Sequence, residues 1–75
     1  MRIVGRVINI TREGMVTVKS SEEVSMGGSI YTGKGELVGK VVRVFGSVKV
    51  HYLSIKPVMV RSKLIPLLNG DLYKR

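Results

Sequence analysis

The residues of this sequence that could do chemistry are few, and they do not form a catalytic pattern. His51 is the only imidazole and no cysteine is present, so the chain lacks the second histidine or the thiolate that a metal site or a catalytic pair would need. The five carboxylates are scattered along the sequence and suggest no acid–base dyad. We therefore expect a protein that is not an enzyme and that uses no metal or cofactor.

One glycine-rich segment looks like a phosphate-binding loop but fails as one. Residues 28–34, GSIYTGK, match the opening of that loop, yet Gly35 stands where a Ser or Thr is needed to hold magnesium. Such a loop must also lead from a strand into a helix whose N-terminus receives the phosphates. Here the sequence predicts a turn into another strand, so nucleotide binding is not expected.

Positive charge is the strongest chemical feature of the chain. Thirteen Lys and Arg against five Asp and Glu give a formal net charge of +8, which attracts polyanions. The charge is uneven, because residues 37–75 carry eight of the cations and a single carboxylate, Asp71. Solubility is the alternative explanation, since Lys on exposed strands also prevents unwanted pairing of edges. The candidates for RNA contact are Lys40, Arg43, Arg61 and Lys63.

Length and hydropathy limit the class of protein. Seventy-five residues make one domain, residues 1–75, with a small hydrophobic core. The apolar runs are far too short to cross a bilayer, and no signal-peptide pattern follows Arg2 and Arg6. We expect a cytoplasmic protein that makes no membrane contact.

The elements that must position these residues are predicted to be strands. Residues with β-branched side chains dominate the apolar set and nine glycines interrupt it, a composition that disfavours helices. Residues 58–68 contain Pro66 and form either an extended loop or a single helical turn. We expect an all-β fold, a small closed six-stranded antiparallel barrel. Its predicted strands are residues 2–10, 15–19, 29–32, 37–45, 47–56 and 71–73.

The two longest predicted strands are joined by Gly46-Ser47, which indicates a tight hairpin. In a regular strand Lys40 and Arg43 would face opposite sides, because the distance between them is odd. A one-residue bulge near Val41 and Val42 resolves this conflict and increases the local twist.

The second strand of this hairpin shows a similar irregularity. Val48 and Val50 share one parity, whereas Leu53 and Ile55 share the other. This change predicts a phase slip near residues 51–52. Paired irregularities of this kind let a small sheet close on itself.

Residues 37–57, LVGKVVRVFGSVKVHYLSIKP, carry a series of landmarks in uninterrupted spacing. Weaker landmarks are Val4-Gly5 in the first strand and NGDLY at residues 69–73, so the pattern extends over nearly the whole domain. The landmarks of the main segment are Val38-Gly39, Phe45-Gly46, Val48-Lys49, Tyr52 and Lys56-Pro57. With these landmarks the chain resembles the Gar family, the small barrel subunit of box H/ACA ribonucleoproteins, in its compact archaeal form.

The resemblance implies a barrel of the translation-factor type that docks on the catalytic pseudouridine synthase subunit. With a guide RNA, that particle converts chosen uridines, chiefly in ribosomal RNA, to pseudouridine. The Gar-type subunit is accessory, has no active site, and affects substrate turnover by engaging a mobile loop of the synthase. This chain lacks the glycine-arginine-rich flanks with which eukaryotic members bind RNA, which argues against strong RNA binding by the isolated domain and favours indirect contact within the particle.

Under this resemblance the docking residues are expected near the end of the main segment. Tyr52 is either an interface anchor or a half-buried strand aromatic, and Phe45 is either a core plug or an interface anchor. Gly39 and Gly46 are expected to serve backbone geometry, through a close approach or a positive φ. An exposed docking patch also favours self-association of the isolated protein. The expected partner-binding residues are Phe45, Lys49, His51, Tyr52, Leu53, Lys56 and Pro57.

A second hypothesis is a barrel that binds RNA or DNA directly, as a ribosomal-protein-like or chromatin protein. Three Tyr and one Phe, scattered along the sequence, make a poor platform for stacking bases, which counts against this hypothesis. Tight RNA binding by the isolated domain at physiological salt would favour it. The phosphate-binding residues would then be Lys40, Arg43, Lys49, Lys56, Arg61 and Lys63.

Overall fold

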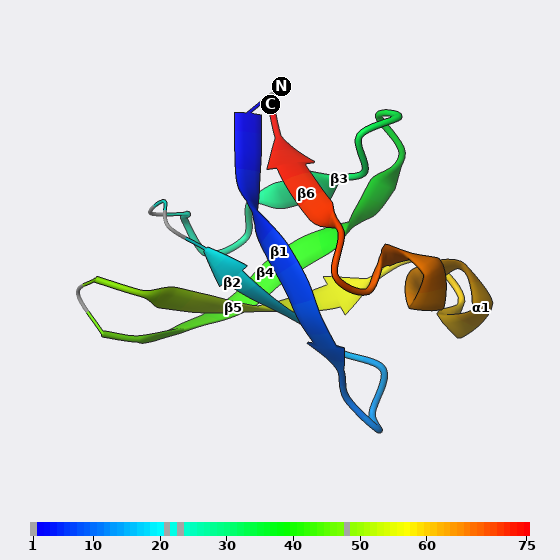
Figure 1. The fold of residues 1–75 in the computed structure, drawn as a ribbon, viewed down its shortest axis with the longest axis horizontal. Coiled ribbons are helices and arrows are strands. Elements are labelled where there is room, and N and C mark those ends of the chain that lie inside the picture. Colours follow the sequence, from blue (N-terminus) through cyan, green and yellow to red (C-terminus); the bar gives the residue numbers. More distant parts are fainter. Residues whose placement is uncertain (1, 21, 23, 48) are drawn as a thin grey trace.

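A computed structural model of the protein describes residues 2–20, 22, 24–47 and 49–75. The chain forms a closed antiparallel barrel in which the strands follow the order β1-β2-β5-β4-β3-β6 (Figure 1). This confirms the expected all-β fold, a small closed six-stranded antiparallel barrel. The strands are β1 (Arg2–Ile10), β2 (Val16–Ser20), β3 (Ser29–Tyr31), β4 (Leu37–Gly46), β5 (His51–Pro57) and β6 (Asp71–Lys74).

A helical connection joins β5 to β6. The short helix α1 (Arg61–Leu64) leads directly into the 3-10 turn η1 (Ile65–Leu67), where Pro66 stands early enough for its missing N–H to be tolerated. Leu64 is buried and anchors α1 to the core. The helical alternative for this segment is therefore correct and the extended loop is wrong. No helix in the described part of the chain is long and apolar enough to span a membrane.

The core of the barrel is aliphatic. None of the four aromatic residues, all of which lie in the described part of the chain, belongs to the buried set. The aromatic side chains therefore remain at the surface, where they can contact other molecules. The buried apolar residues are Val4, Val7, Val16, Val18, Val24, Ile30, Val38, Val41, Leu53, Ile55, Leu64 and Leu72.

The β4–β5 hairpin is the longest element and extends beyond the rest of the barrel (Figure 1). The register of its two strands shifts between Val41 and Arg43, so the bulge expected near Val41 and Val42 is confirmed. The bulge leaves Val41 in the core while Lys40 and Arg43 are both exposed.

The start of β5 differs from the prediction. The last pair of the hairpin joins Gly46 to His51, and the Ser47 N–H donates to the Val50 carbonyl oxygen at 2.9 Å in the turn between them. Ser47, Lys49 and Val50 thus lie in the connection rather than in a strand, so the predicted strand start at residue 47 is wrong. Because Gly46 pairs with His51, the predicted tight turn at Gly46-Ser47 is also wrong. The register of β5 runs without interruption from His51 onward, so the slip predicted at residues 51–52 is also wrong. Val50 belongs to the turn, and Val48 lies outside the described residues.

The two glycines singled out in the hairpin serve backbone geometry, as expected. Gly39 pairs with Pro57, and a Cβ atom at Gly39 would collide with the Lys56 carbonyl oxygen. Gly46 has a φ of +112°, a conformation that side-chain-bearing residues rarely adopt. Gly39 therefore permits the close approach of β4 and β5, and Gly46 turns the chain at the end of β4.

Candidate functional site

Candidate functional residues lie on the surface of the barrel rather than in a catalytic cluster. Within the described ranges no three His, Cys, Asp or Glu side chains gather closely enough to hold a metal ion. The described cavities are open surface depressions lined by short runs of residues from neighbouring elements.

One row of outward-facing side chains crosses four neighbouring strands. Residues paired across antiparallel strands point to the same side of the sheet. Arg6 of β1 lies opposite Lys19 of β2, and Lys19 lies opposite Tyr52 of β5. Tyr52 in turn lies opposite Phe45 of β4. The barrel register thus aligns two cations and two aromatic rings that are distant in the sequence.

Further rows run parallel to the first on the same outer face. Ser54 of β5 lies between Thr17 of β2 and Arg43 of β4. Beyond it, Lys56 lies opposite Lys40. We call this surface the basic face and define it by Arg6, Lys19, Lys40, Arg43, Lys56, Phe45 and Tyr52.

The aromatic residues of the basic face form a stacked pair. The ring centroids of Phe45 and Tyr52 are 5.6 Å apart with an interplanar angle of 22°, and the Arg43 guanidinium lies 5.2 Å from the Phe45 centroid. Phe45 is 39% exposed, so its interpretation as a core plug is wrong. Tyr52 is half-buried on its strand. Since Tyr31 also pairs with Tyr73, the aromatic residues form two pairs and are not scattered in space.

The basic face concentrates positive charge, and the carboxylate that the register places beside it is Asp71 of β6, opposite Arg6. Arg6 opposite Lys19 and Lys56 opposite Lys40 are two pairs of like charges placed directly across from each other. Such pairs destabilise a sheet. The salt bridges of the described residues join Glu22 to Arg2 at 2.8 Å and to Lys74 at 3.4 Å, outside this face.

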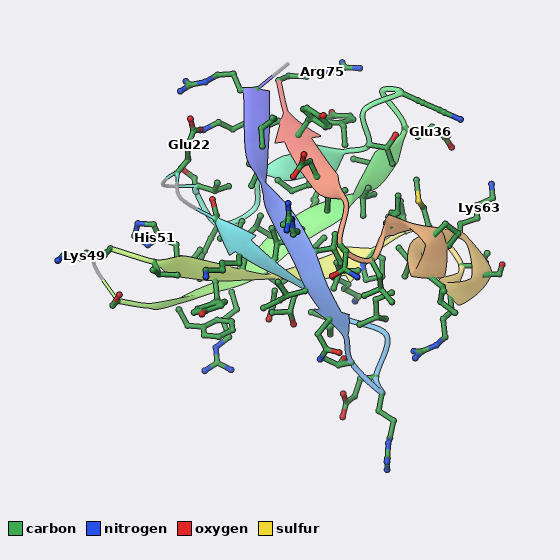
Figure 2. The ribbon with its side chains drawn as sticks, in the orientation of Figure 1. Glu22, Glu36, Lys49, His51, Lys63 and Arg75 are labelled. Atoms are coloured by element: carbon green, nitrogen blue, oxygen red, sulfur yellow. The ribbon has the colours of Figure 1, made fainter. Side chains whose placement is uncertain are left out.

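The docking residues expected from the resemblance do not share one surface. Leu53 is 0% exposed, so its expected contact with a partner is wrong, because strand alternation turns it into the core between Tyr52 and Ser54. His51 faces the opposite side from Tyr52 by the same alternation. Lys49 and His51 lie together near the hairpin tip (Figure 2), whereas Pro57 ends β5 at the other end of the strand.

The expected RNA contacts are also divided. Lys40 and Arg43 belong to the basic face, but Arg61 and Lys63 lie on α1. The hairpin tip and α1 stand at opposite ends of the long axis of the molecule (Figure 1), and Figure 2 places Lys63 far from the tip.

Arg6 and Lys19 were not predicted as members of the basic face. The alternation within each strand does indicate that both cations face outward. Arg6 directly precedes the core residue Val7, and Lys19 directly follows the core residue Val18. Their position beside Tyr52 depends on the order and register of β1, β2 and β5.

The end of the barrel next to α1 exposes apolar side chains. Leu37 is 38% exposed, Val58 67% and Val60 64%, and together with Met59 they line a groove of about 520 Å³ whose border includes Glu36 and Lys63. The Val58 N–H donates to the Val38 carbonyl oxygen at 2.8 Å, which fixes the backbone at the start of this segment. We call Leu37, Val58, Met59 and Val60 the apolar end.

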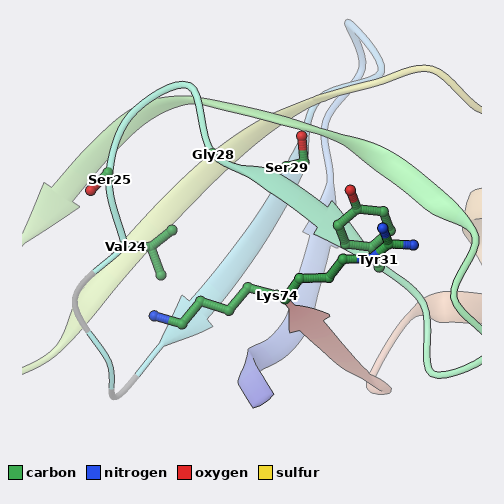
Figure 3. Close-up of a pocket in the computed structure, with 7 residues that line it drawn as sticks. Val24, Ser25, Gly28, Ser29, Tyr31 and Lys74 are labelled. Atoms are coloured by element: carbon green, nitrogen blue, oxygen red, sulfur yellow. The ribbon is translucent and has the colours of Figure 1, made fainter. Parts of the chain in front are cut away.

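A third feature is a cavity of about 310 Å³ beside Lys74 and Arg75, at the end of β6 (Figure 3). The Arg75 guanidinium lies 4.6 Å from the centroid of the Tyr31 ring, and the Lys74 side chain runs along the cavity. Ser29, which also lines the cavity, lies opposite Lys40 of the basic face. The cavity therefore adjoins the outer edge of that face across β3 and β4.

Comparison with known proteins finds a similar archaeal protein. No model of a known protein family matches the sequence. The chain is similar to an uncharacterized protein from Methanothermobacter thermautotrophicus, with 30% identity over 57 residues. The match covers 76% of this chain and 62% of that protein, so the chain matches less than two thirds of the relative's length.

Proposed function

We propose that this chain is a non-catalytic accessory subunit of an archaeal-type box H/ACA ribonucleoprotein. In this role it binds the catalytic pseudouridine synthase subunit in the cytoplasm and supports RNA-guided pseudouridylation of ribosomal RNA. The main support for the proposal is the resemblance of residues 37–57 to the Gar family. They fold as the long β4–β5 hairpin of a closed six-stranded barrel, the architecture that the resemblance implies.

The apolar end is the surface that we assign to the synthase. Its centre is aliphatic, while Glu36 and Lys63 border the groove, and an apolar centre with a charged rim is typical of protein interfaces. Val58 and Val60 are more exposed than the apolar residues of the basic face, Phe45 included. Pro57, one of the expected docking residues, leads directly into this surface.

The backbone of the apolar end is held in place before a partner arrives. Buried Leu64 anchors α1, and the Lys63 N–H donates to the Val60 carbonyl oxygen at 2.9 Å. Together with the Val58–Val38 hydrogen bond, these contacts limit the conformational entropy that docking would cost.

Mixing the purified chain with the purified synthase subunit of the same organism tests the proposal. Size-exclusion chromatography should give a complex that persists at moderately high salt, because buried apolar contacts are not screened by ions. Val58→Asp should disrupt the complex. Met26→Asp is the matched control, since Met26 is also 67% exposed but lies in the segment between β2 and β3. If the two wild-type proteins elute separately, the proposal is wrong.

The competing role as a ribosomal-protein-like or chromatin barrel makes a different prediction. It requires nucleic-acid binding through the basic face and no complex with the synthase. The basic face is the structural feature that favours it, because the stacked Phe45–Tyr52 pair removes the objection that the aromatic residues are scattered. The same mixing experiment separates the two roles.

A further inference from the structure

We propose that the basic face binds single-stranded RNA, with phosphates held by its cations and a base stacked on the Phe45–Tyr52 pair. This inference depends on the outer surface of β1, β2, β5 and β4. It holds whether or not the apolar end docks on a synthase.

The like-charge pairs are the first reason for an anionic ligand. Arg6–Lys19 and Lys40–Lys56 are direct cross-strand neighbours, and like charges in this position repel each other. Asp71 of β6 lies opposite Arg6 on its other side and offsets part of the first repulsion, so the Lys40–Lys56 pair carries the larger cost. A phosphate placed between the two members of a pair would accept charge-assisted hydrogen bonds from both. Binding a polyanion therefore relieves these repulsions, above all the one between Lys40 and Lys56.

The spacing of the cations suits a chain of phosphates better than a single anion. Residues that are two positions apart on a strand are separated by about 7 Å, so the Lys40–Lys56 pair lies about 13 Å along β5 from the row that contains Tyr52. Arg43 stands between these two groups, beside Phe45. The cations thus form an extended track rather than one pocket.

The aromatic pair is the second, independent reason. Phe45 is 39% exposed although it is a large apolar side chain at the outer half of the hairpin. Lys19 flanks the pair on the Tyr52 side and Arg43 on the Phe45 side. An exposed ring flanked by cations can stack on a base while the neighbouring phosphates are neutralised.

The composition of the face favours nucleic acid over protein as the occupant. The centre of a protein interface is poor in charged residues, Lys above all, whereas here cations surround the two rings. The row between the cations carries Asn9, Thr17 and Ser54, whose side chains both donate and accept hydrogen bonds. Such groups match the ribose 2′-hydroxyl, which distinguishes RNA from DNA.

Fluorescence anisotropy with the full chain and a labelled RNA of about 12 nucleotides tests the proposal. Each phosphate contact to a single strand contributes roughly −0.7 to the slope of log affinity against log salt. Contacts from all cations of the face predict a slope of about −3.5, so affinity should fall about a hundredfold between about 50 and about 200 mM salt. A single-stranded DNA and a duplex RNA of equal length serve as the other two probes.

Substitutions separate the basic face from the general charge of the protein. The double variant Lys40→Gln with Lys56→Gln should make the slope of log affinity against log salt less steep by about 1.4, because two phosphate contacts are lost. Arg61→Gln with Lys63→Gln removes the same charge from α1 and should change the affinity by no more than about twofold. Phe45→Ala should weaken binding about tenfold and leave the slope unchanged. Thermal unfolding checks that each variant folds.

Four results would overturn the inference. Equal losses for the two double variants would mean that net charge alone attracts RNA. Equal affinity for the DNA strand would remove the role given to the ribose, and tighter binding of the duplex would remove the role of stacking. Finally, if Phe45→Ala abolishes the synthase complex and leaves RNA affinity unchanged, the face is a protein interface.

Discussion

The basic face and the apolar end both include residues of β4, but they arise in different ways. The basic face lies where the strands are regularly paired, so alternation and register decide which side chains meet. The apolar end lies where pairing stops, after Pro57, and its exposure depends on how far α1 covers the barrel. Strand pairing thus produces one exposed surface and strand ending produces the other, and the two partners proposed above would use these two surfaces separately.

Removing a core side chain beneath the hairpin should affect both surfaces together, and it has the largest expected effect. Leu53→Ala should lower the free energy of unfolding by about 2–5 kcal/mol, because it leaves a cavity among fully buried residues. Urea denaturation measures this loss. Val44, opposite Leu53 but 36% exposed, is the control, and Val44→Ala should cost about 1 kcal/mol or less. Equal costs at the two positions would contradict the assignment of Leu53 to the core.

Changing the apolar end alone should separate the two surfaces. Val58→Ser with Val60→Ser should weaken synthase binding by about 2 kcal/mol or more, roughly thirtyfold, if these side chains are central to the interface. Both residues are exposed, so stability should change by only about 0.5 kcal/mol at each. The substitutions leave the net charge unchanged, and RNA affinity should stay the same. Calorimetric titration measures the affinity for the synthase, and fluorescence anisotropy measures the affinity for RNA. If the double variant loses both affinities, the two surfaces are not separate binding sites.

A substitution where the two surfaces meet should disturb both by a moderate amount. Gly39→Ala places a Cβ against the Lys56 carbonyl oxygen and should force β4 and β5 apart, at a cost of about 1–3 kcal/mol. Gly33→Ala is the control, because the nearest atom there is in the Tyr73 ring at 3.2 Å, a side chain that can move. Thermal unfolding measures both. A Gly39→Ala protein as stable as the control would show that the close approach is not required.

Reversing one charge on the basic face should have the smallest effect on stability. The change should be a stabilisation, which would show that the two lysines repel each other in the wild-type barrel. Lys56→Glu converts the Lys40–Lys56 repulsion into an attraction and should stabilise the barrel by about 0.2–1 kcal/mol while weakening RNA binding. Lys63→Glu on α1 should produce neither effect. Denaturation and anisotropy on the same samples give both readings. Destabilisation by Lys56→Glu would argue against the repulsive pair.

Much of the fold could be predicted because it depends on local alternation. The first strand and the bulge near Val41 followed from the spacing of apolar and charged residues. The start of β5 could not be predicted, since Val50 has strand propensity but the positive φ of Gly46 delays pairing until His51. Propensity identifies residues that fit a strand, whereas the turn decides where the strand begins.

The candidate site was less predictable because it is assembled from register. Lys40 and Arg43 were predicted to face outward together, but the neighbours of Tyr52 became visible only once β2 was paired with β5. The apolar end was missed because sequence does not tell which aliphatic residue of the β5–β6 connection is buried. Leu64 is 2% exposed and adjacent Ile65 is 51% exposed.

The pairing of Arg2 with Lys74 brings the two ends of the described chain side by side, away from the hairpin tip and from α1 (Figure 1). For protein engineering, this arrangement means that the barrel can be inserted as a unit into a loop of a carrier protein with little distortion of either. It also means that a short linker could join the ends and that the chain could be opened between Gly46 and His51 instead. In such a permuted barrel β4 and β5 would no longer be joined by a turn, and the basic face and the apolar end would both still face solvent.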